Sequence, residues 1–296
     1  MQRTPKPVSS SERLTTPDGD FLDLDWTEDN DGPLVVIFHG LTGSSKSHYA
    51  QSLMHRLNKN KVRAVVMHFR GCSGEPNRSR TSYHSGHTQD ISFVIDTLRK
   101  RFPNRPIAAA GFSLGGNALL KYLGTTPDNP LQFALSVSPP LALAEAAMRM
   151  TQGFSRVYQR SLLEKMKQAV HAKHASYPHL GLDEFDLQSV DNFFDFDHRY
   201  TAPIHGFESG TDYYHRASTL GDLINITTPT HIIWSQDDPF FTSKCIPTND
   251  QLSDAVDFEL TTHGGHVGFI GGSIPGVGRD WLSQRASELL IANLAR

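Results

Sequence analysis

A serine flanked by glycines is the part of the sequence that points most directly to chemistry. The segment Gly111-Phe112-Ser113-Leu114-Gly115 follows an apolar run and opens a helical pattern. Glycines around a serine at such a junction permit a turn so tight that the hydroxyl is raised above a sheet, where it can attack a substrate. The alternative is a glycine-rich turn with an incidental serine. Because both flanking patterns fit, Ser113 is predicted to be a catalytic nucleophile.

A serine hydroxyl needs a base, and the base needs a group that orients it. Asp237 and Asp238 follow a later apolar run, and His263 and His266 flank a pair of glycines further on. An acid just before a proline, three residues after a small residue, is a common arrangement, and it selects Asp238. His266 is the predicted base, because the glycines before it let the loop reach the serine. Asp237 and His263 are predicted to shape the turn and to support the loop.

An oxyanion that forms during acyl transfer has to be held by hydrogen-bond donors. One expected donor is the backbone N–H of Leu114, the residue after the predicted nucleophile. The segment His39-Gly40-Leu41-Thr42-Gly43 ends the first long apolar run, and the N–H of Leu41 is the expected second donor. A simple turn into a helix is the alternative for this segment.

Short, continuous apolar runs have to position these residues. Continuous rather than alternating apolarity predicts strands that are covered on both faces, as in a parallel sheet. Helical patterns lie between the runs, so the order predicts a mostly parallel, doubly wound α/β sheet. An alternating run over 21–26 predicts one antiparallel strand near the start. The predicted buried strands are 34–38, 64–69, 107–111, 133–137, 230–234 and 256–260, and the helices are 48–57, 88–101, 114–123 and 281–294.

One section interrupts the alternation of strands and helices. Residues 141–226 contain no buried strand, and a helical stretch over 141–170 begins this section. We predict a single domain over residues 1–296, with 141–226 as a helical cap insertion over the carboxyl edge of the sheet. Phe193, Phe194 and Phe196 line an acyl pocket or pack the insertion on the core, and the sequence leaves both readings open.

Composition excludes several classes of function. The 296 residues carry a net charge of −3 with no long basic run, so a nucleic-acid partner is not expected. Two cysteines cannot build a disulfide framework and fit a reducing compartment. We find no signal-peptide pattern and no stretch of ~18 uncharged apolar residues, which predicts a cytoplasmic protein without an integral membrane segment. Peripheral membrane contact and the oligomeric state stay open.

Histidine pairs raise the question of a metal site. His171 and His174 lie three apart on a predicted helix, and His263 and His266 have the same spacing on a loop. Zinc needs three or four ligands, and no third cluster in the sequence carries a clear metal signature. We therefore predict no metal and no cofactor.

At this point the sequence resembles the YheT-like branch of the α/β hydrolases, also called the AB-hydrolase-4 type esterases. The resemblance spans nearly the whole chain, and no predicted triad position departs from the family pattern. It implies hydrolysis of carboxylic esters, with lipid-like or monoacylglycerol substrates for the eukaryotic members. The motifs that carry it are residues 39–43, 68–74, 111–117, 212–214, 235–240 and 263–269.

Residues and resemblance together predict a carboxylesterase that cleaves small-molecule esters, acylglycerols or short-to-medium acyl esters among them. Ser113, His266 and Asp238 form its predicted triad, and the reaction passes through an acyl-enzyme. A thioesterase or an acyltransferase could use the same triad. A non-catalytic ligand-binding protein is the alternative from another class, although it should have lost a triad residue. An aspartate nucleophile is disfavoured, because a serine occupies the tight turn.

Overall fold

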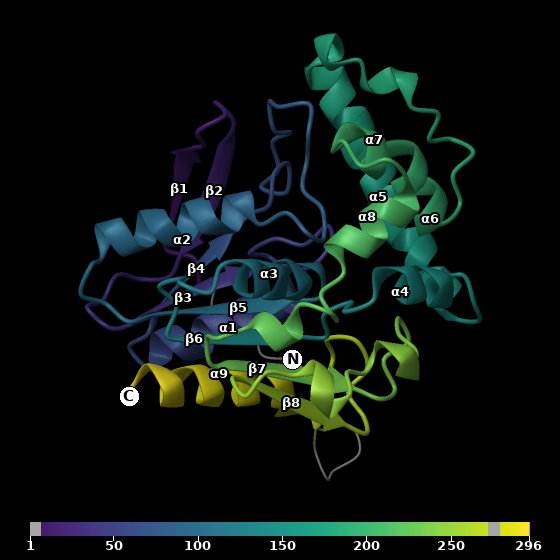
Figure 1. The fold of residues 1–296 in the computed structure, drawn as a ribbon. Coiled ribbons are helices and arrows are strands. Elements are labelled where there is room, and N and C mark those ends of the chain that lie inside the picture. The colour runs from purple at the N-terminus through teal and green to yellow at the C-terminus, as the bar shows by residue number, and fades with distance from the viewer. Residues whose placement is uncertain (1–6, 272–278, 296) are drawn as a thin grey trace.

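An eight-stranded sheet forms the centre of the computed structural model, which describes residues 7–271 and 279–295 (Figure 1). The strand order is β1-β2-β4-β3-β5-β6-β7-β8, and the six strands from β4 to β8 in this order are parallel to one another. This confirms the predicted α/β fold. The strands are β1 (Ser10–Thr15), β2 (Phe21–Trp26), β3 (Leu34–Phe38), β4 (Arg63–Met67), β5 (Ile107–Phe112), β6 (Phe133–Val137), β7 (Thr230–Ser235) and β8 (Val256–Thr261), with a separate pair β9 (Ile270–Gly271) and β10 (Arg279–Asp280).

Helices cover both faces of this sheet. Alternate residues of β3 belong to different core clusters, because successive strand side chains point to opposite faces. One cluster includes α1 and α9, and the other includes α2 and α3. The helices are α1 (His48–Lys59), α2 (Gln89–Arg101), α3 (Leu114–Thr125), α4 (Leu143–Met150), α5 (Ser155–Ser176), α6 (Phe193–Phe196), α7 (Ala202–Ile204), α8 (Gly210–Ala217) and α9 (Trp281–Leu294). Shorter turns are η1 (Pro178–Leu180), η2 (Leu182–Glu184), the π-helical η3 (Asp197–Thr201), η4 (Leu223–Asn225), η5 (Ser243–Cys245) and η6 (Asn249–Gln251).

The sheet differs from the prediction at its antiparallel edge. The edge strand β1 was not predicted, because only Leu14 of its six residues is buried and no apolar pattern marks it. It pairs with β2 in antiparallel register, and β2 pairs with β4. The predicted strand 64–69 is β4, which ends at Met67. His68 and Phe69 are buried beyond its end, so their apolar surroundings extended the predicted run too far.

The chain between β6 and β7 folds into helices that stand beside the carboxyl end of the sheet (Figure 1). The predicted helical stretch over 141–170 is two helices, α4 and α5. The chain turns between them at Gly153, whose φ of 53° lies in the left-handed region that glycine adopts without strain. Two apolar clusters of their own hold these helices together. Within the residues that the structure describes, no helix is both long and apolar enough to cross a membrane.

Candidate active site

The parallel strands bring the predicted site residues to one edge of the sheet. Strands β3, β5, β7 and β8 all end there, and the loops that follow them carry Leu41, Ser113, Asp238 and His266. Ligand sites of open α/β sheets lie at this carboxyl edge. Residues that are far apart in the sequence are therefore neighbours in the fold.

A chain of two hydrogen bonds links the acid, the histidine and the serine. The hydroxyl of Ser113 donates to Nε2 of His266 at 2.8 Å, and Nδ1 of His266 donates to Oδ2 of Asp238 at 2.8 Å. An ionised carboxylate can only accept, so the proton of the neutral imidazole belongs on Nδ1. The carboxylate of Asp238 is fully buried, and its other oxygen accepts the N–H of Phe240 at 2.9 Å. The imidazole is thus held with its basic nitrogen toward the serine.

Ser113 occupies the strained turn that its sequence context predicts. Its φ of 52° and ψ of −120° are unusual for any residue other than glycine. Gly115 allows this turn to press against the end of β3, since a Cβ there would come within 2.4 Å of the carbonyl oxygens of Phe38 and His39. Three more non-glycine residues with positive φ lie in the loops around the serine: Thr42, Ser138 and Phe269. Such strain gathers at functional sites.

Aromatic side chains pack against the ring of His266 and fix its position. The sequence did not predict this packing. Phe240 stacks on the imidazole with ring centroids 4.0 Å apart, and Phe241 meets it edge-on at 5.4 Å. The hydroxyl of Ser138 donates to the backbone carbonyl of His266. Because Phe240 lies only two residues after Asp238, one loop supplies both the acid and the aromatic wall. The position of Phe240 directly after Pro239 was visible in the sequence, but its contact was not.

The buried imidazole of His39 orients the peptide between Gly40 and Leu41. Burial lowers the pKa of His39 to about 3, so the ring is neutral. Its Nε2 accepts the N–H of Phe69 at 3.1 Å, which leaves Nδ1 to donate to the carbonyl of Gly40 at 2.8 Å. The carbonyl also accepts the N–H of Gly43 at 2.9 Å.

The N–H of a trans peptide points away from its carbonyl, so the Leu41 N–H points away from His39. Gly40 lies against the serine, because a Cβ there would be 3.2 Å from Cβ of Ser113. Within the described residues, neither the N–H of Leu41 nor that of Leu114 has a hydrogen-bond acceptor. Both N–H groups are therefore free of a protein acceptor within that part of the chain.

The neighbouring carboxylate, Asp237, holds the turn instead of the imidazole. Its Oδ1 accepts the N–H groups of Gly264 and Gly265 at 2.9 and 2.8 Å, and Ser235 donates its hydroxyl at 2.5 Å. These bonds outweigh desolvation and lower the pKa of Asp237 to about 2. His263 is 88% exposed and lies 3.4 Å from this carboxylate. The two aspartates thus have different partners.

A cavity of about 110 Å³ opens at the serine. Its walls are mostly apolar and come from α4, α5 and the loop after β7, with Leu41, Leu114 and Phe240 among them. Phe193 lines it, whereas Phe194 is exposed and Phe196 packs within the helices of the 141–226 section. Phe193 thus fits the pocket reading and Phe196 the packing reading, whereas Phe194 fits neither.

Asp197 is the one carboxylate among the described residues that line this cavity. It accepts hydrogen bonds from the hydroxyls of Tyr214 at 2.8 Å and Thr201 at 2.6 Å. Burial nevertheless raises its pKa to about 6. The sequence did not single out this residue, because Tyr214 reaches it from a separate helix, α8.

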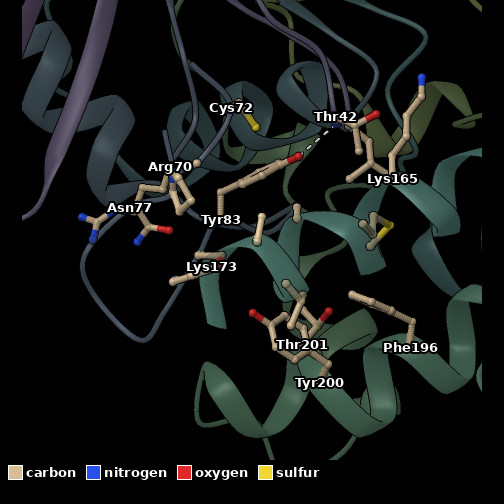
Figure 2. Close-up of a pocket in the computed structure, with 18 of the residues that line it drawn as sticks. Thr42, Arg70, Cys72, Asn77, Tyr83, Lys165, Lys173, Phe196, Tyr200 and Thr201 are labelled. Atoms are coloured by element: carbon tan, nitrogen blue, oxygen red, sulfur yellow. Dashed lines mark hydrogen bonds between the residues drawn. The ribbon is translucent and has the colours of Figure 1, made fainter. Parts of the chain in front are cut away.

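A second cavity, of about 390 Å³, lies next to the first (Figure 2). The two share Leu41 and Met166 in their walls, and the second does not contain the serine. Its buried cations are already occupied: Arg70 contacts carboxylates, and Lys173 donates to the carbonyls of Arg80 and Thr81. Desolvation lowers the pKa of the Lys173 ammonium to about 8. The exposed Lys165 also lines this mostly apolar cavity, and it forms no ion pair within the described residues.

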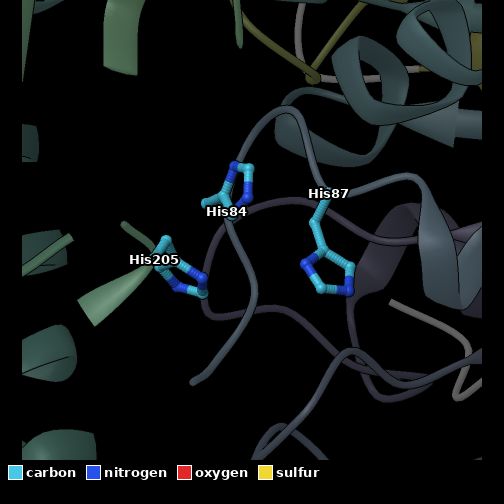
Figure 3. A group of neighbouring side chains, drawn as sticks. All are labelled: His84, His87 and His205. Carbon is cyan, nitrogen blue, oxygen red and sulfur yellow. The ribbon is translucent and has the colours of Figure 1, made fainter. Parts of the chain in front are cut away.

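Three histidines form the one group in the described residues that could hold a metal (Figure 3). His84 and His87 lie in the loop before α2, and His205 follows α7 in the 141–226 section. One ring nitrogen of each lies within 4.8 Å of the others. Zinc–nitrogen bonds of about 2 Å would bring the nitrogens of a tetrahedral site to about 3.3 Å, so the rings would have to move inward.

Contacts around these rings disfavour a bound cation. Nδ1 of His84 accepts the N–H of Gly86 at 3.1 Å, and the ring is packed edge-on against Phe207. The positive charges of Arg216 near His84, and of Lys173 and Arg70 near His205, would repel a cation bound there. The sequence prediction considered other histidine pairs and missed this group, because 118 residues (205 − 87) separate His205 from His87.

The buried histidines predict a loss of stability in acid. Burial lowers the pKa of His39 and of His205 to about 3, and it holds the pKa of His84 well below its usual value. The same side chains titrate near ~6.5 in the unfolded chain. Between those values the unfolded state binds more protons, so the free energy of unfolding falls as the pH is lowered from about 7 toward 4.

The melting temperature, measured at steps from pH 7.5 to 4.5, should therefore fall steadily. Asp197 acts in the opposite sense, since its raised pKa makes the folded state take up a proton between about pH 4 and 6. One carboxyl offsets only part of the effect of three imidazoles. The fall should be shallower in His205→Gln, which has one imidazole fewer. An unchanged slope in that variant would contradict this account.

Comparisons with known proteins show the family to which the chain belongs. The family model described as "alpha/beta hydrolase fold" matches residues 33–273. The chain belongs to the α/β-hydrolase family. The hydrolase is 44% identical to the protein named "Putative esterase YheT" of Escherichia coli, over 96% of this chain and 85% of that protein. It is 32% identical to "Monoacylglycerol lipase" of Saccharomyces cerevisiae, over 81% of this chain and 56% of the yeast protein.

Among solved structures, the Pyrococcus furiosus esterase Pf2001 matches the hydrolase with a TM-score of 0.61. The match covers 100% of this chain and 95% of the esterase at 16% identity, which shows the shared fold. The relatives place the hydrolase in the YheT-like branch, as predicted, and among the esterase- and lipase-type members of the family.

Proposed function

We propose that this hydrolase cleaves carboxylic esters through a triad of Ser113, His266 and Asp238. The observation that carries the proposal is the continuous hydrogen-bond chain from the buried Asp238 carboxylate through His266 to the Ser113 hydroxyl. A serine in a strained turn, a base in contact with it and an orienting acid are the parts that nucleophilic acyl transfer requires.

Acylation begins when Oγ of Ser113 attacks the ester carbonyl carbon and its proton passes to Nε2 of His266. The carbonyl oxygen becomes an oxyanion, which the N–H groups of Leu41 and Leu114 stabilise. Asp238 stabilises the imidazolium that has formed. The bond from the carbonyl carbon to the alcohol oxygen then breaks, and His266 gives its proton to that oxygen.

Deacylation repeats these steps with water as the nucleophile. His266 takes a proton from water, whose oxygen attacks the acyl-enzyme at the same carbonyl carbon. The bond to Oγ of Ser113 breaks, the serine recovers its proton from His266, and the carboxylic acid leaves. The donors that hold the first oxyanion also hold the second, since the carbonyl stays in place.

The two cavities suggest how an ester is placed. The apolar cavity at Ser113 suits an acyl chain of short to medium length, in line with the acylglycerol and acyl-ester substrates that the resemblance implies. The larger cavity beyond Leu41 and Met166, whose wall includes the polar side chains of Asn77 and Thr201, suits the alcohol portion. We accordingly propose one catalytic domain over residues 1–296, in which residues 141–226 act as a cap that walls both cavities.

A fluorophosphonate probe tests the proposal. The probe phosphonylates only a serine whose hydroxyl is activated by a base, so it should label the folded protein at Ser113 and block hydrolysis of a soluble ester such as 4-nitrophenyl butyrate. His266→Gln should abolish labelling, whereas the exposed His263→Gln should retain it. Absence of labelling in folded wild-type protein would instead support a non-catalytic binding protein.

A further inference from the structure

Residues 141–226 carry an exposed apolar surface. The proposed ester hydrolysis does not use this surface. Four of the seven large apolar side chains that are exposed in the described residues come from one short segment at the junction of α4 and α5. Phe154 is 71% exposed, Met148 and Val157 are each 58% exposed, and Tyr158 is 42% exposed. Scattered exposed apolar residues are ordinary, but a contiguous group marks an interaction site.

The helical spacing makes this group continuous. Phe154, Val157 and Tyr158 are separated by three and four residues, so they share one face of α5. The rings of Phe154 and Tyr158 contact each other edge-on, with centroids 5.6 Å apart. Ser155, Gln159 and Leu163 are the buried residues at this end of α5, and they hold its opposite side against the protein. We call the exposed group of Met148, Phe154, Val157 and Tyr158 the cap patch.

Basic residues accompany the cap patch, and acidic ones are absent from it. Residues 146–163 contain Arg149, Arg156 and Arg160 and no Asp or Glu, although the whole chain has a net charge of −3. None of these arginines forms an ion pair within the part of the chain that the structure describes. The flanking acids already have partners, since Glu145 pairs with Lys244 and Glu164 lies 3.9 Å from Lys167.

The start of α5 is not arranged for helix stability. Its N-cap residue, Phe154, makes no side-chain cap, and the first turn has no acid. Arg156 stands in that turn, where the helix dipole disfavours a positive charge. Phe154 and Arg156 therefore make the start of this helix less stable. Residues that lower stability in this way are expected where a surface serves binding.

The cap patch is continuous with the active site. The ring of Tyr158 lies 5.3 Å from that of Phe240, which stacks on His266 at 4.0 Å. The hydroxyl of Ser155 donates to the carbonyl of Pro239 at 2.5 Å, which ties the start of α5 to the loop that carries the acid. Met150, two residues after Met148, lines the cavity at the serine.

We infer that the cap patch docks the enzyme on the surface of an anionic phospholipid membrane. Apolar side chains that insert at the boundary of headgroups and acyl chains, flanked by arginines that meet acidic headgroups, are the elements of such a surface. Docking there would set the cavity at Ser113 against the lipid from which an acyl ester comes. The inference rests on the proposed ester hydrolysis, but membrane binding can be measured in a variant that does not hydrolyse esters.

Sedimentation with vesicles tests the inference. Purified Ser113→Ala protein should sediment with vesicles made of equal parts of phosphatidylglycerol and phosphatidylcholine, and much less with phosphatidylcholine alone or at high salt. The double variants Phe154→Ser/Val157→Ser and Arg156→Gln/Arg160→Gln should each bind about tenfold more weakly or worse. The control is Ile224→Ser, because Ile224 is 50% exposed but lies in η4, which precedes β7 and so is remote from the carboxyl edge. It should bind as the parent does.

Hydrolysis of a soluble ester separates this inference from the proposed function. Both double variants, made with the serine present, should retain wild-type turnover of 4-nitrophenyl butyrate and the wild-type melting temperature. Binding that is equal for the parent and both double variants would overturn the inference, as would no binding of the parent to the anionic vesicles. A dimer in solution that Phe154→Ser/Val157→Ser dissociates would overturn it too, and would assign the cap patch to a second copy of the chain.

Discussion

Ester hydrolysis should fall on the order of 10⁶-fold in Ser113→Ala, down to the background that the remaining site supports. The variant removes the oxygen that attacks the carbonyl carbon, and no other hydroxyl in the described residues contacts Nε2 of His266. The substitution deletes one hydrogen bond at the rim of a cavity, so the melting temperature should change by only a few degrees.

The measurement is the turnover of a soluble ester by purified protein, beside its melting temperature. A matched control is Ser287→Ala, which removes a buried serine hydroxyl on α9 that donates to the carbonyl of Gln284. It should keep its turnover. If Ser113→Ala were to keep a wild-type rate while it stays folded, a different group would have to be the nucleophile, and the proposed mechanism would be wrong.

The second large effect should distinguish two adjacent aspartates. Asp238→Asn should lower turnover about 10⁴-fold, because an amide cannot stabilise the imidazolium and favours the wrong imidazole tautomer. Asp237→Asn should act mainly on stability, by about 1 kcal/mol, because its carboxylate holds the N–H groups of Gly264 and Gly265. His266→Gln and His263→Gln should differ in the same way, since His263 is an exposed neighbour of Asp237.

Turnover and melting temperature of all four variants have to be compared in the same preparation. The expected pattern is two variants with lost turnover and near-normal melting, and two with retained turnover. A larger loss of turnover in the folded Asp237 or His263 variant would move the triad to the other member of that pair. Each variant thus serves as the control for its neighbour.

The order of apolar runs in the sequence predicts much of this fold, because each central strand is apolar on both faces. Strands β3, β5 and β6 are buried throughout, and their boundaries lie within one residue of those predicted. The edge strand β1 escaped prediction, because solvent covers it and pairing with β2 alone maintains it. The break between α4 and α5 was also missed, since Gly153 interrupts an otherwise helical pattern only by its backbone conformation.

The candidate site could be predicted in part, for a related reason. The structure brings Ser113, Asp238 and His266 together because each follows its own parallel strand, and strand order is visible in the sequence. Their catalytic roles stay predictions. Contacts between side chains of separate loops were not visible, among them the stacking of Phe240 on His266 and the approach of His205 to His84.

The strained backbone at Ser113 means that stability of the fold and activity favour different residues at this position. A non-glycine residue with φ of 52° costs on the order of 1–3 kcal/mol, and glycine would remove most of that cost. The substitution that most relaxes this turn is therefore one that deletes the proposed nucleophile. In a lineage that no longer needed the chemistry, drift toward a more stable fold would favour the loss of this serine. A side chain that persists in this conformation is thus a record of continued use, which a relaxed residue elsewhere in the core cannot provide.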